Sequence, residues 1–236
     1  MINKSHNSLR LLSFKKSFLP HAEGSCLVKM GQTQVLCVAT VEEKAPPHAI
    51  EKGIGWVSAE YAMLPRSGQQ RSSRQKCSTG GRAQEISRLV GRSLRSAVDL
   101  KLLGNRTITI DCDVIRADGG TRTASINGGF VALHLAIQKI FKAGLISEWP
   151  IRDFIGAVSV GLYKNKVFLD MSYNEDKDAQ ADVNVVMTSH GELIEVQGTA
   201  EEKPFSMKQF EQMIDLAKKG ISQITKEQKK VLGVKK

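Results

Sequence analysis

The chain has 236 residues, of which 41% are hydrophobic, and it carries a formal net charge of +10 with a pI of about 9.5. This length supplies ample core for one large domain or two small ones. No run of roughly 18 apolar residues and no apolar N-terminal signal core occur, so we expect a soluble, cytoplasmic protein. The basic charge suits a polyanion, either nucleic acid or an anionic membrane, although basic proteins without such partners are common.

The cysteines show no CxxC spacing, and three of them, Cys26, Cys37 and Cys112, fall inside apolar strand patterns. We expect buried thiols in a reducing compartment, not a disulfide framework or a zinc site. The histidines are scattered without paired spacing. We interpret His134 as a packing or surface residue and not as a catalyst.

In chain order, residues 1–20 are basic and weakly patterned. Alternating residues predict a hairpin of two strands, 25–30 and 33–41, around a Gly31-Gln32 turn, and a further strand at 55–63. Residues 65–81 contain no apolar residue except Cys77 and include Arg66, Arg71, Arg74 and Lys76. They predict a mobile cationic loop, which is either a solvated linker or a contact for RNA or another subunit.

Residues 82–100 form the clearest helical pattern, with one apolar face and with Arg88, Arg92 and Arg95 on the opposite face. These three arginines form a stripe that is either solvated or faces RNA, and we favour the solvated interpretation. Arg82 differs, because it follows Gly80-Gly81 and lies on the first turn at the azimuth of the apolar face. An arginine that points inward needs an anion to justify its burial.

Residues 111–129 (DCDVIRADGGTRTASINGG) form the central motif of the chain. A strand with period-2 alternation runs into a turn at Asp118-Gly119-Gly120, and Arg122 and several hydroxyls precede an apolar helix that we place at 126–143. Unpaired N–H groups at a helix start, glycines and a guanidinium together favour a phosphate-sized anion. An ordinary capped turn with a solvated arginine is the alternative. Arg82 and Arg122 could converge on one anion.

The second half predicts a hairpin of strands 155–163 and 167–173, strands at 183–188 and 193–198, and a helix opened by a Ser206–Gln209 capping box. The hairpin resembles the one at 24–41, which suggests two similar halves packed as one domain.

Four carboxylates lie close together in the segment that follows this hairpin: Glu175, Asp176, Asp178 and Asp182. Hard oxygen ligands of this kind suit Mg²⁺ or Mn²⁺. Strand alternation places Asp182 and Asn184 on one face, and Asp176 can return to that face across the loop. The alternative is an exposed acidic loop.

Several long runs resemble the ribonuclease PH family. They are HAEGS (21–25), GWVSAEYAMLPRS (55–67), GGRAQEISRLVGRSLR (80–95), DCDVIRADGGTRTASI (111–126), ADVNVVMT (181–188) and IEVQGTAEEKPF (194–205). The resemblance extends in one register from about residue 8 to about residue 232. It implies a single ribonuclease PH-like domain over residues 1–236, of α/β class, with a ribosomal-protein-S5-domain-2-like core of mixed β-sheets and packed helices.

The same resemblance implies a phosphorolytic 3′→5′ exoribonuclease, a tRNA nucleotidyltransferase that trims transfer-RNA precursors, uses inorganic phosphate and releases nucleoside diphosphates. It implies phosphate binding at Arg82, Gly120, Thr121 and Arg122, and a Mg²⁺ or Mn²⁺ site at Asp176 and Asp182. It further implies RNA binding or ring assembly at Arg66, Arg71 and Arg74, in a homo-hexamer built as a trimer of dimers.

The chain also departs from the family pattern. The N-terminal stretch INKSHNSLRLLS retains only Arg10 as an obvious match, the loop before Gly80 is shorter, and Ala83 stands where threonine is common. Two other functions remain open: a catalytically inactive RNA-binding subunit of an exosome-like ring, and a nucleotide-binding kinase of the same broad fold. The GGTRT run lacks the lysine of a P-loop.

Overall fold

The structure is a computed structural model that describes residues 5–201 and 203–234. Two β-sheets are present, with strand orders β1-β2-β3-β5-β4 and β7-β6-β8-β9. The strands are β1 (Leu12–Lys16), β2 (Gly24–Met30), β3 (Thr33–Glu42), β4 (Trp56–Met63), β5 (Thr107–Arg116), β6 (Ile155–Tyr163), β7 (Lys166–Leu169), β8 (Ala181–Thr188) and β9 (Leu193–Ala200). The helices are α1 (Pro47–Ile50), α2 (Arg74–Thr79), α3 (Gly81–Ser96), α4 (Thr121–Lys142), α5 (Tyr173–Lys177) and α6 (Met207–Leu232), with a 3₁₀ turn at Leu100–Leu103.

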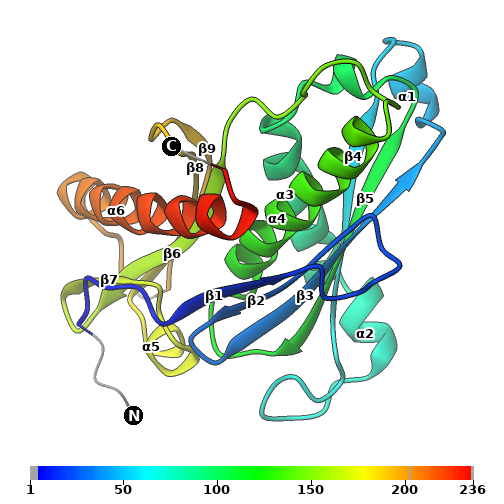
Figure 1. The fold of residues 1–236 in the computed structure, drawn as a ribbon. Coiled ribbons are helices and arrows are strands. Elements are labelled where there is room, and N and C mark those ends of the chain that lie inside the picture. Colours follow the sequence, from blue (N-terminus) through cyan, green and yellow to red (C-terminus); the bar gives the residue numbers. More distant parts are fainter. Residues whose placement is uncertain (1–4, 202, 235–236) are drawn as a thin grey trace.

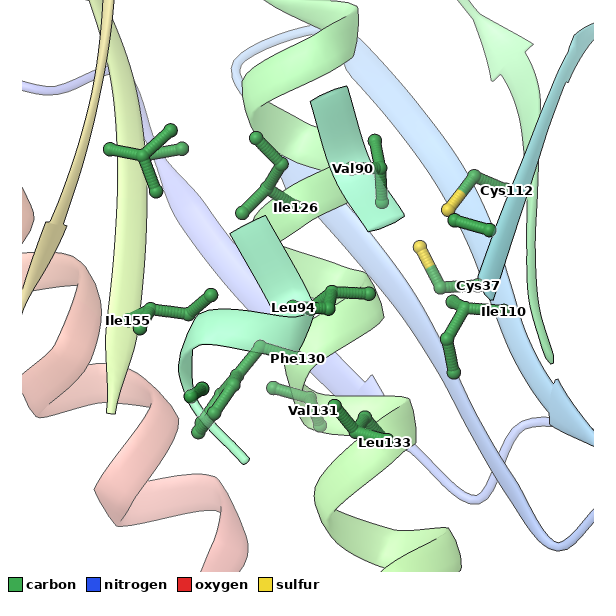
Figure 2. Close-up of a cluster of buried hydrophobic side chains, with 14 of the residues drawn as sticks. Cys37, Val90, Leu94, Ile110, Cys112, Ile126, Phe130, Val131, Leu133 and Ile155 are labelled. Atoms are coloured by element: carbon green, nitrogen blue, oxygen red, sulfur yellow. The ribbon is translucent and has the colours of Figure 1, made fainter. Parts of the chain in front are cut away.

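Helix α4 is the central element, and it lies between the two sheets (Figure 1). Buried residues lie on nearly every side of α4, because strands of both sheets and the helices α3 and α6 pack around it. Figure 2 shows Phe130 and Ile126 of this helix between Ile155 of the second sheet and Cys37 and Ile110 of the first. The two sheets therefore share one hydrophobic core, which confirms the predicted α/β class with mixed sheets and packed helices.

The predicted β2–β3 hairpin is confirmed, with Gly31 in the left-handed conformation at its turn. Strands β4 and β5 pair in parallel, and α3 makes the crossover between them. The pairs within the second sheet are antiparallel. The similarity of the two halves thus includes the hairpins β2–β3 and β6–β7 but does not include the parallel pair.

Helix α4 begins at Thr121, five positions before the predicted start at Ile126. The prediction was wrong because it relied on apolar periodicity, whereas the first turns use small polar residues. Thr123, Ala124 and Ser125 are buried there, and Ser125 Oγ donates to the Thr121 carbonyl at 2.9 Å. Hydroxyls that bond within their own helix can replace apolar residues in a tightly packed turn.

The boundary after β7 also differs from the prediction. The expected strand 167–173 ends at Leu169, because Asp170 adopts a left-handed conformation (φ 52°) that breaks the strand. A capping box between Ser172 and Glu175 then opens α5 where strand and loop were expected. The Ser206–Gln209 capping box of α6 is confirmed.

Several short elements were missed: besides α5, they include α1 (Pro47–Ile50), β1 and α2. Residues 12–16 form edge strand β1 against β2, within a region whose lysines obscured the alternation of Leu12 and Phe14. The segment expected as a loop at 65–81 contains α2, whose Ser73 side chain caps the Lys76 N–H. No residue of α2 is buried, so apolar periodicity could not reveal it. This segment and α2 project from the end of the first sheet (Figure 1).

Helix α3 ends at Ser96 and not at Leu100, because Val98 leaves the helix and bridges to Ile151. The arginine stripe on this helix is only partly solvated. Arg95 is half-buried: it donates to the Val57 carbonyl at 2.8 Å and its guanidinium lies 4.5 Å from the Trp56 ring centroid.

The remaining predictions on packing are confirmed. All four cysteines are free thiols, and Cys26, Cys37 and Cys112 are buried. His134 is buried against the rings of Phe130, Trp149 and Phe154, and burial lowers its pKa to about 4. Within residues 5–201 and 203–234, no helix combines the length and apolarity needed to cross a bilayer.

Candidate active site

A pocket of about 1070 Å³ lies between the N-termini of α3 and α4 on one side and the strands β8 and β9 with α5 on the other. The predicted phosphate and metal residues all line it: Arg82, Gly120, Thr121, Arg122, Asp176 and Asp182. These residues come from segments that are far apart in the sequence. The structure therefore brings together the two arginines and the two carboxylates that the sequence singled out separately.

The cationic side of the pocket is formed by Arg122 and Arg82. The Arg122 side chain is 19% exposed, and its Nη1 donates to Gln197 Oε1 at 3.2 Å and to Glu85 Oε1 at 3.4 Å. Arg82 is exposed, so the prediction that it is buried was wrong, although it does line the pocket. It lies on the first turn of α3, whereas the neighbouring Ala83 is buried in the core. Within the described part of the chain, Arg82 makes no hydrogen bond or ion pair.

The turn before α4 places backbone N–H groups at the pocket. Gly119 and Gly120 have φ values of 77° and 64°, a left-handed pair that glycine adopts without strain. A Cβ at Gly119 would lie 2.5 Å from the Met171 carbonyl oxygen. The N-cap, Gly120, offers no side-chain cap to the helix. The first N–H groups of α4 therefore remain available for an acceptor from solution.

Tyr61 supports this turn from beneath. Its hydroxyl lies 2.9 Å from Thr121 Oγ1, and the ring is 3% exposed. Burial raises the pKa of Tyr61. The hydrogen bond to Thr121 and the charges of Arg82 and Arg122 lower this pKa and partly offset the effect of burial. The phenol is therefore neutral at physiological pH and fixes the rotamer of Thr121.

The acidic side of the pocket is formed by Asp182 on β8 and Asp176 on α5. Asn184 Nδ2 donates to Asp182 Oδ2 at 3.2 Å, which confirms that these two side chains share a strand face. Burial, and then the charge of Asp176, raise the pKa of Asp182 to about 6. Burial also raises the pKa of Asp176, against the opposing effect of Arg82 and Arg122.

The other two carboxylates of the acidic segment have different roles. Glu175 accepts from the Ser172 N–H and hydroxyl at 2.8 and 2.9 Å as part of the cap of α5, and Asp178 is exposed. The simple alternative of an exposed acidic loop therefore fits Asp178 but not Asp176 or Asp182.

The donor set of the acidic side fits a divalent cation. Asp182 Oδ1 is buried and has no hydrogen-bond partner among the described residues. A hard divalent cation would stabilise the charged forms of Asp176 and Asp182, whose pKa values are raised. It would also provide a partner for the buried Asp182 Oδ1.

Sequence analysis missed Ser159, which lines the pocket from β6. This residue is 4% exposed, pairs across the sheet with Asn184, and its Oγ has no partner among the residues described. The only sequence signal was a single serine in the largely apolar run IGAVSVGLY, and that run does not reveal which face the serine occupies.

The basic residues Arg66, Arg71 and Arg74 are exposed and do not line this pocket. Arg66 donates to the carbonyls of Gly68 and Gln69 and borders a separate surface hollow with Arg116.

Comparison with known proteins gives consistent matches over the chain. The models of the 3′ exoribonuclease family match residues 8–137 as domain 1 and residues 153–220 as domain 2. The ribonuclease PH of Moorella thermoacetica is 52% identical over 227 residues, which cover 95% of this chain and 91% of that protein. The ribonuclease PH of Bacillus subtilis is 50% identical over 233 residues, covering 98% and 95%.

A solved structure gives the same result for the fold. Rice (Oryza sativa) Rrp46 superposes with a TM-score of 0.77 and 21% identity, covering 98% of each chain. This similarity agrees with the predicted ribosomal-protein-S5-domain-2-like core. Together with the near full-length matches above, it shows that the chain belongs to the 3′ exoribonuclease family, among its ribonuclease PH members.

Proposed function

We propose that this protein is a phosphate-dependent 3′→5′ exoribonuclease that trims the 3′ ends of transfer-RNA precursors. Its reaction is RNA plus inorganic phosphate giving RNA shortened by one nucleotide plus a nucleoside 5′-diphosphate, and it is reversible. The observation that carries this proposal is the single pocket that holds a cationic anion-binding side opposite a pair of half-buried carboxylates. This arrangement favours an active enzyme over the inactive RNA-binding subunit.

The cationic side binds the nucleophile. Arg122 and Arg82 neutralise phosphate, and the N–H groups at the start of α4 direct hydrogen bonds to its oxygens. Glu85 and Gln197, which hold Arg122 in the absence of an anion, keep its guanidinium in place so that little reorganisation is needed on binding. Phosphoryl transfer depends mainly on such positioning and on neutralisation of charge.

The acidic side receives the 3′ end of the RNA. Asp176 and Asp182 would hold Mg²⁺ or Mn²⁺, with Asp182 Oδ1 as the oxygen in need of a partner. When bound, the metal supplies a positive charge that stabilises the terminal phosphodiester and the departing 3′-oxygen. Asn184 keeps the Asp182 carboxylate oriented through its 3.2 Å hydrogen bond.

Water is a poor substitute for phosphate in this pocket. The α4 N-terminus and the two arginines form a site for a tetrahedral anion with several acceptor oxygens. The cationic side of the lining therefore favours phosphate as the nucleophile.

We further propose that Arg66, Arg71 and Arg74 bind RNA or a neighbouring subunit in a homo-hexamer arranged as a trimer of dimers. All three side chains are exposed, and α2, which begins at Arg74, has no buried residue; both observations support this role. Charges of this kind have no packing function that would otherwise explain them.

The test is incubation of pure protein with a 3′-extended transfer RNA and Mg²⁺, with and without inorganic phosphate. We expect shortening only with phosphate, and nucleoside diphosphates as the products. Release of nucleoside monophosphates without phosphate would contradict the proposal.

A further inference from the structure

Arg10, in the N-terminal stretch that otherwise departs from the family pattern, lies directly behind the phosphate side of the pocket. Its side chain is 8% exposed, and it forms an ion pair with Asp170, whose side chain is fully buried. Arg10 Nη2 lies 2.7 Å from Asp170 Oδ1, and the Arg10 backbone N–H donates to Asp170 Oδ2 at 2.8 Å. One contact from the guanidinium and one from the backbone therefore join Arg10 to both oxygens of Asp170, away from solvent.

The two terminal nitrogens of the Arg10 guanidinium also reach the glycine turn, whereas its buried Nε has no hydrogen-bond partner among the described residues. Nη1 donates to the Asp118 carbonyl, and Nη2 donates to the Gly119 carbonyl at 3.3 Å. Gly31, at the β2–β3 turn, makes room for this approach, because a Cβ there would lie 2.7 Å from Arg10 Cδ.

Thr33 holds the same turn from β3. Its Oγ1 donates to the Gly119 carbonyl at 2.7 Å and accepts from the Asp118 N–H at 2.9 Å. Arg10 and Thr33 thus occupy both carbonyls that precede Gly120. With those peptide groups fixed, the orientation of the following N–H groups toward the pocket is also fixed.

From this geometry we infer that Arg10 is a positioning residue for phosphate: it holds the Asp118–Gly119 carbonyls so that the start of α4 keeps its anion-binding orientation. This inference rests on the proposed phosphorolytic function. Asp170 extends the effect, because it ends β7 and leads within three residues to α5, which carries Asp176. The Arg10 guanidinium therefore joins the glycine turn before α4 to Asp170, which begins the segment that leads to α5 and Asp176.

Arg10→Lys is the sharpest test. Lysine keeps the positive charge beside Asp170 but lacks the planar fork that reaches two carbonyls as well. We expect the dissociation constant of inorganic phosphate, measured by calorimetry without RNA, and the phosphate KM to rise about tenfold. The affinity for RNA should remain within about twofold.

Arg106→Lys is the matched control. Arg106 also binds a carboxylate, that of Glu43 at 2.9 Å, and a carbonyl, that of Leu103 at 3.3 Å, but it does not line the pocket. This variant should lose thermal stability without any change in the phosphate KM. If Arg10→Lys behaves in the same way, Arg10 is merely structural and the inference is wrong.

Thr33→Val provides a second variant in case Arg10→Lys fails to fold. It keeps the shape of the side chain and removes both hydrogen bonds to the turn, so we expect weaker phosphate binding from it as well. Unchanged phosphate binding in this variant would overturn the inference. Phosphate-independent trimming by the wild type would instead remove the proposed function, so the two failures can be told apart.

Discussion

Arg122 is the residue on which the phosphate side depends most. Its guanidinium is already held by Gln197 and Glu85, and both contacts use Nη1. The other nitrogens therefore remain for an incoming anion, and the side chain loses little conformational entropy when phosphate binds.

Arg122→Ala should reduce kcat/KM for phosphate by about 2–4 kcal/mol of transition-state stabilisation. Affinity for RNA should change little, because the acidic side is untouched. Steady-state kinetics at limiting phosphate measures the effect. Arg152→Ala is a suitable control, since Arg152 pairs with Asp99 at 3.0 Å outside the pocket. Near-normal turnover in Arg122→Ala would place the phosphate site elsewhere.

Asp182 makes the stability of the metal-free protein depend on pH. Because burial raises its pKa from 3.8 to about 6, the folded protein holds a proton that the unfolded chain has lost between these two values. The free energy of unfolding therefore falls as the pH rises through this window. Above the folded-state pKa the stability stays at its lower value. Below the lower value both states are protonated and the effect disappears.

Asp182→Asn should remove the loss of stability that ionisation of Asp182 causes. Without divalent metal, the variant should be more stable than the wild type at pH 7.5 by on the order of 2 kcal/mol, and the difference should vanish near pH 4. Added Mg²⁺ should stabilise the wild type but not the variant. Chemical denaturation at several pH values checks both effects. Identical Mg²⁺ responses would assign Asp182 to a purely structural role.

Among the elements, those with strong apolar periodicity could be predicted from sequence, and those set by backbone conformation could not. The β2–β3 hairpin and the capped start of α6 are confirmed. The start of α4 was misplaced because its small hydroxyl residues carry no hydrophobic signal. The phosphate and metal residues of the pocket could be predicted from motifs in the sequence. The roles of Arg10, Tyr61 and Ser159 could not, because they depend on contacts between distant segments that periodicity does not describe.

The tight contact between the glycine turn and the start of α5 can be tested at Gly119. Gly119→Ala combines a left-handed φ of 77° with a clash at 2.5 Å against the Met171 carbonyl. Gly53→Ala is the matched control, because Gly53 has φ 63° but no neighbouring atom within 4 Å of the added Cβ. We expect both variants to lose about 1–2 kcal/mol from backbone strain and Gly119→Ala to lose more, together with phosphate binding. Equal losses of stability in the two variants would mean that the clash is relieved easily.

For the whole molecule, we propose that residues 1–236 form a single folding unit, although the family is described by two domain models. Residues of both sheets contribute to one hydrophobic cluster around α4. Thermal unfolding should then give one transition, with fluorescence and circular dichroism following the same curve. Two separated transitions would indicate independent domains.

The arginines of the projecting segment can be tested together. Replacing Arg66, Arg71 and Arg74 by alanine should leave each subunit folded, because none of the three is buried. It should shift the assembly from hexamers toward dimers and weaken the binding of long structured RNA, while phosphorolysis of a short oligonucleotide suffers less. Light scattering gives the assembly state. A stable hexamer with undiminished transfer-RNA binding would identify the segment as a solvated linker.

The distribution of the thiols has a practical consequence for such measurements. Burial raises the pKa of Cys26 to about 12 and that of Cys37 well above its ordinary value, and Cys112 is buried too. Cys77 alone of the four cysteines is partly exposed, and it lies on α2 beside Arg74. A thiol-reactive fluorophore added to the native protein would therefore mark one position, next to the basic residues. If the proposed contacts of this segment are correct, a fluorophore on Cys77 would report RNA binding or subunit exchange in the wild-type chain, with no cysteine to remove or introduce.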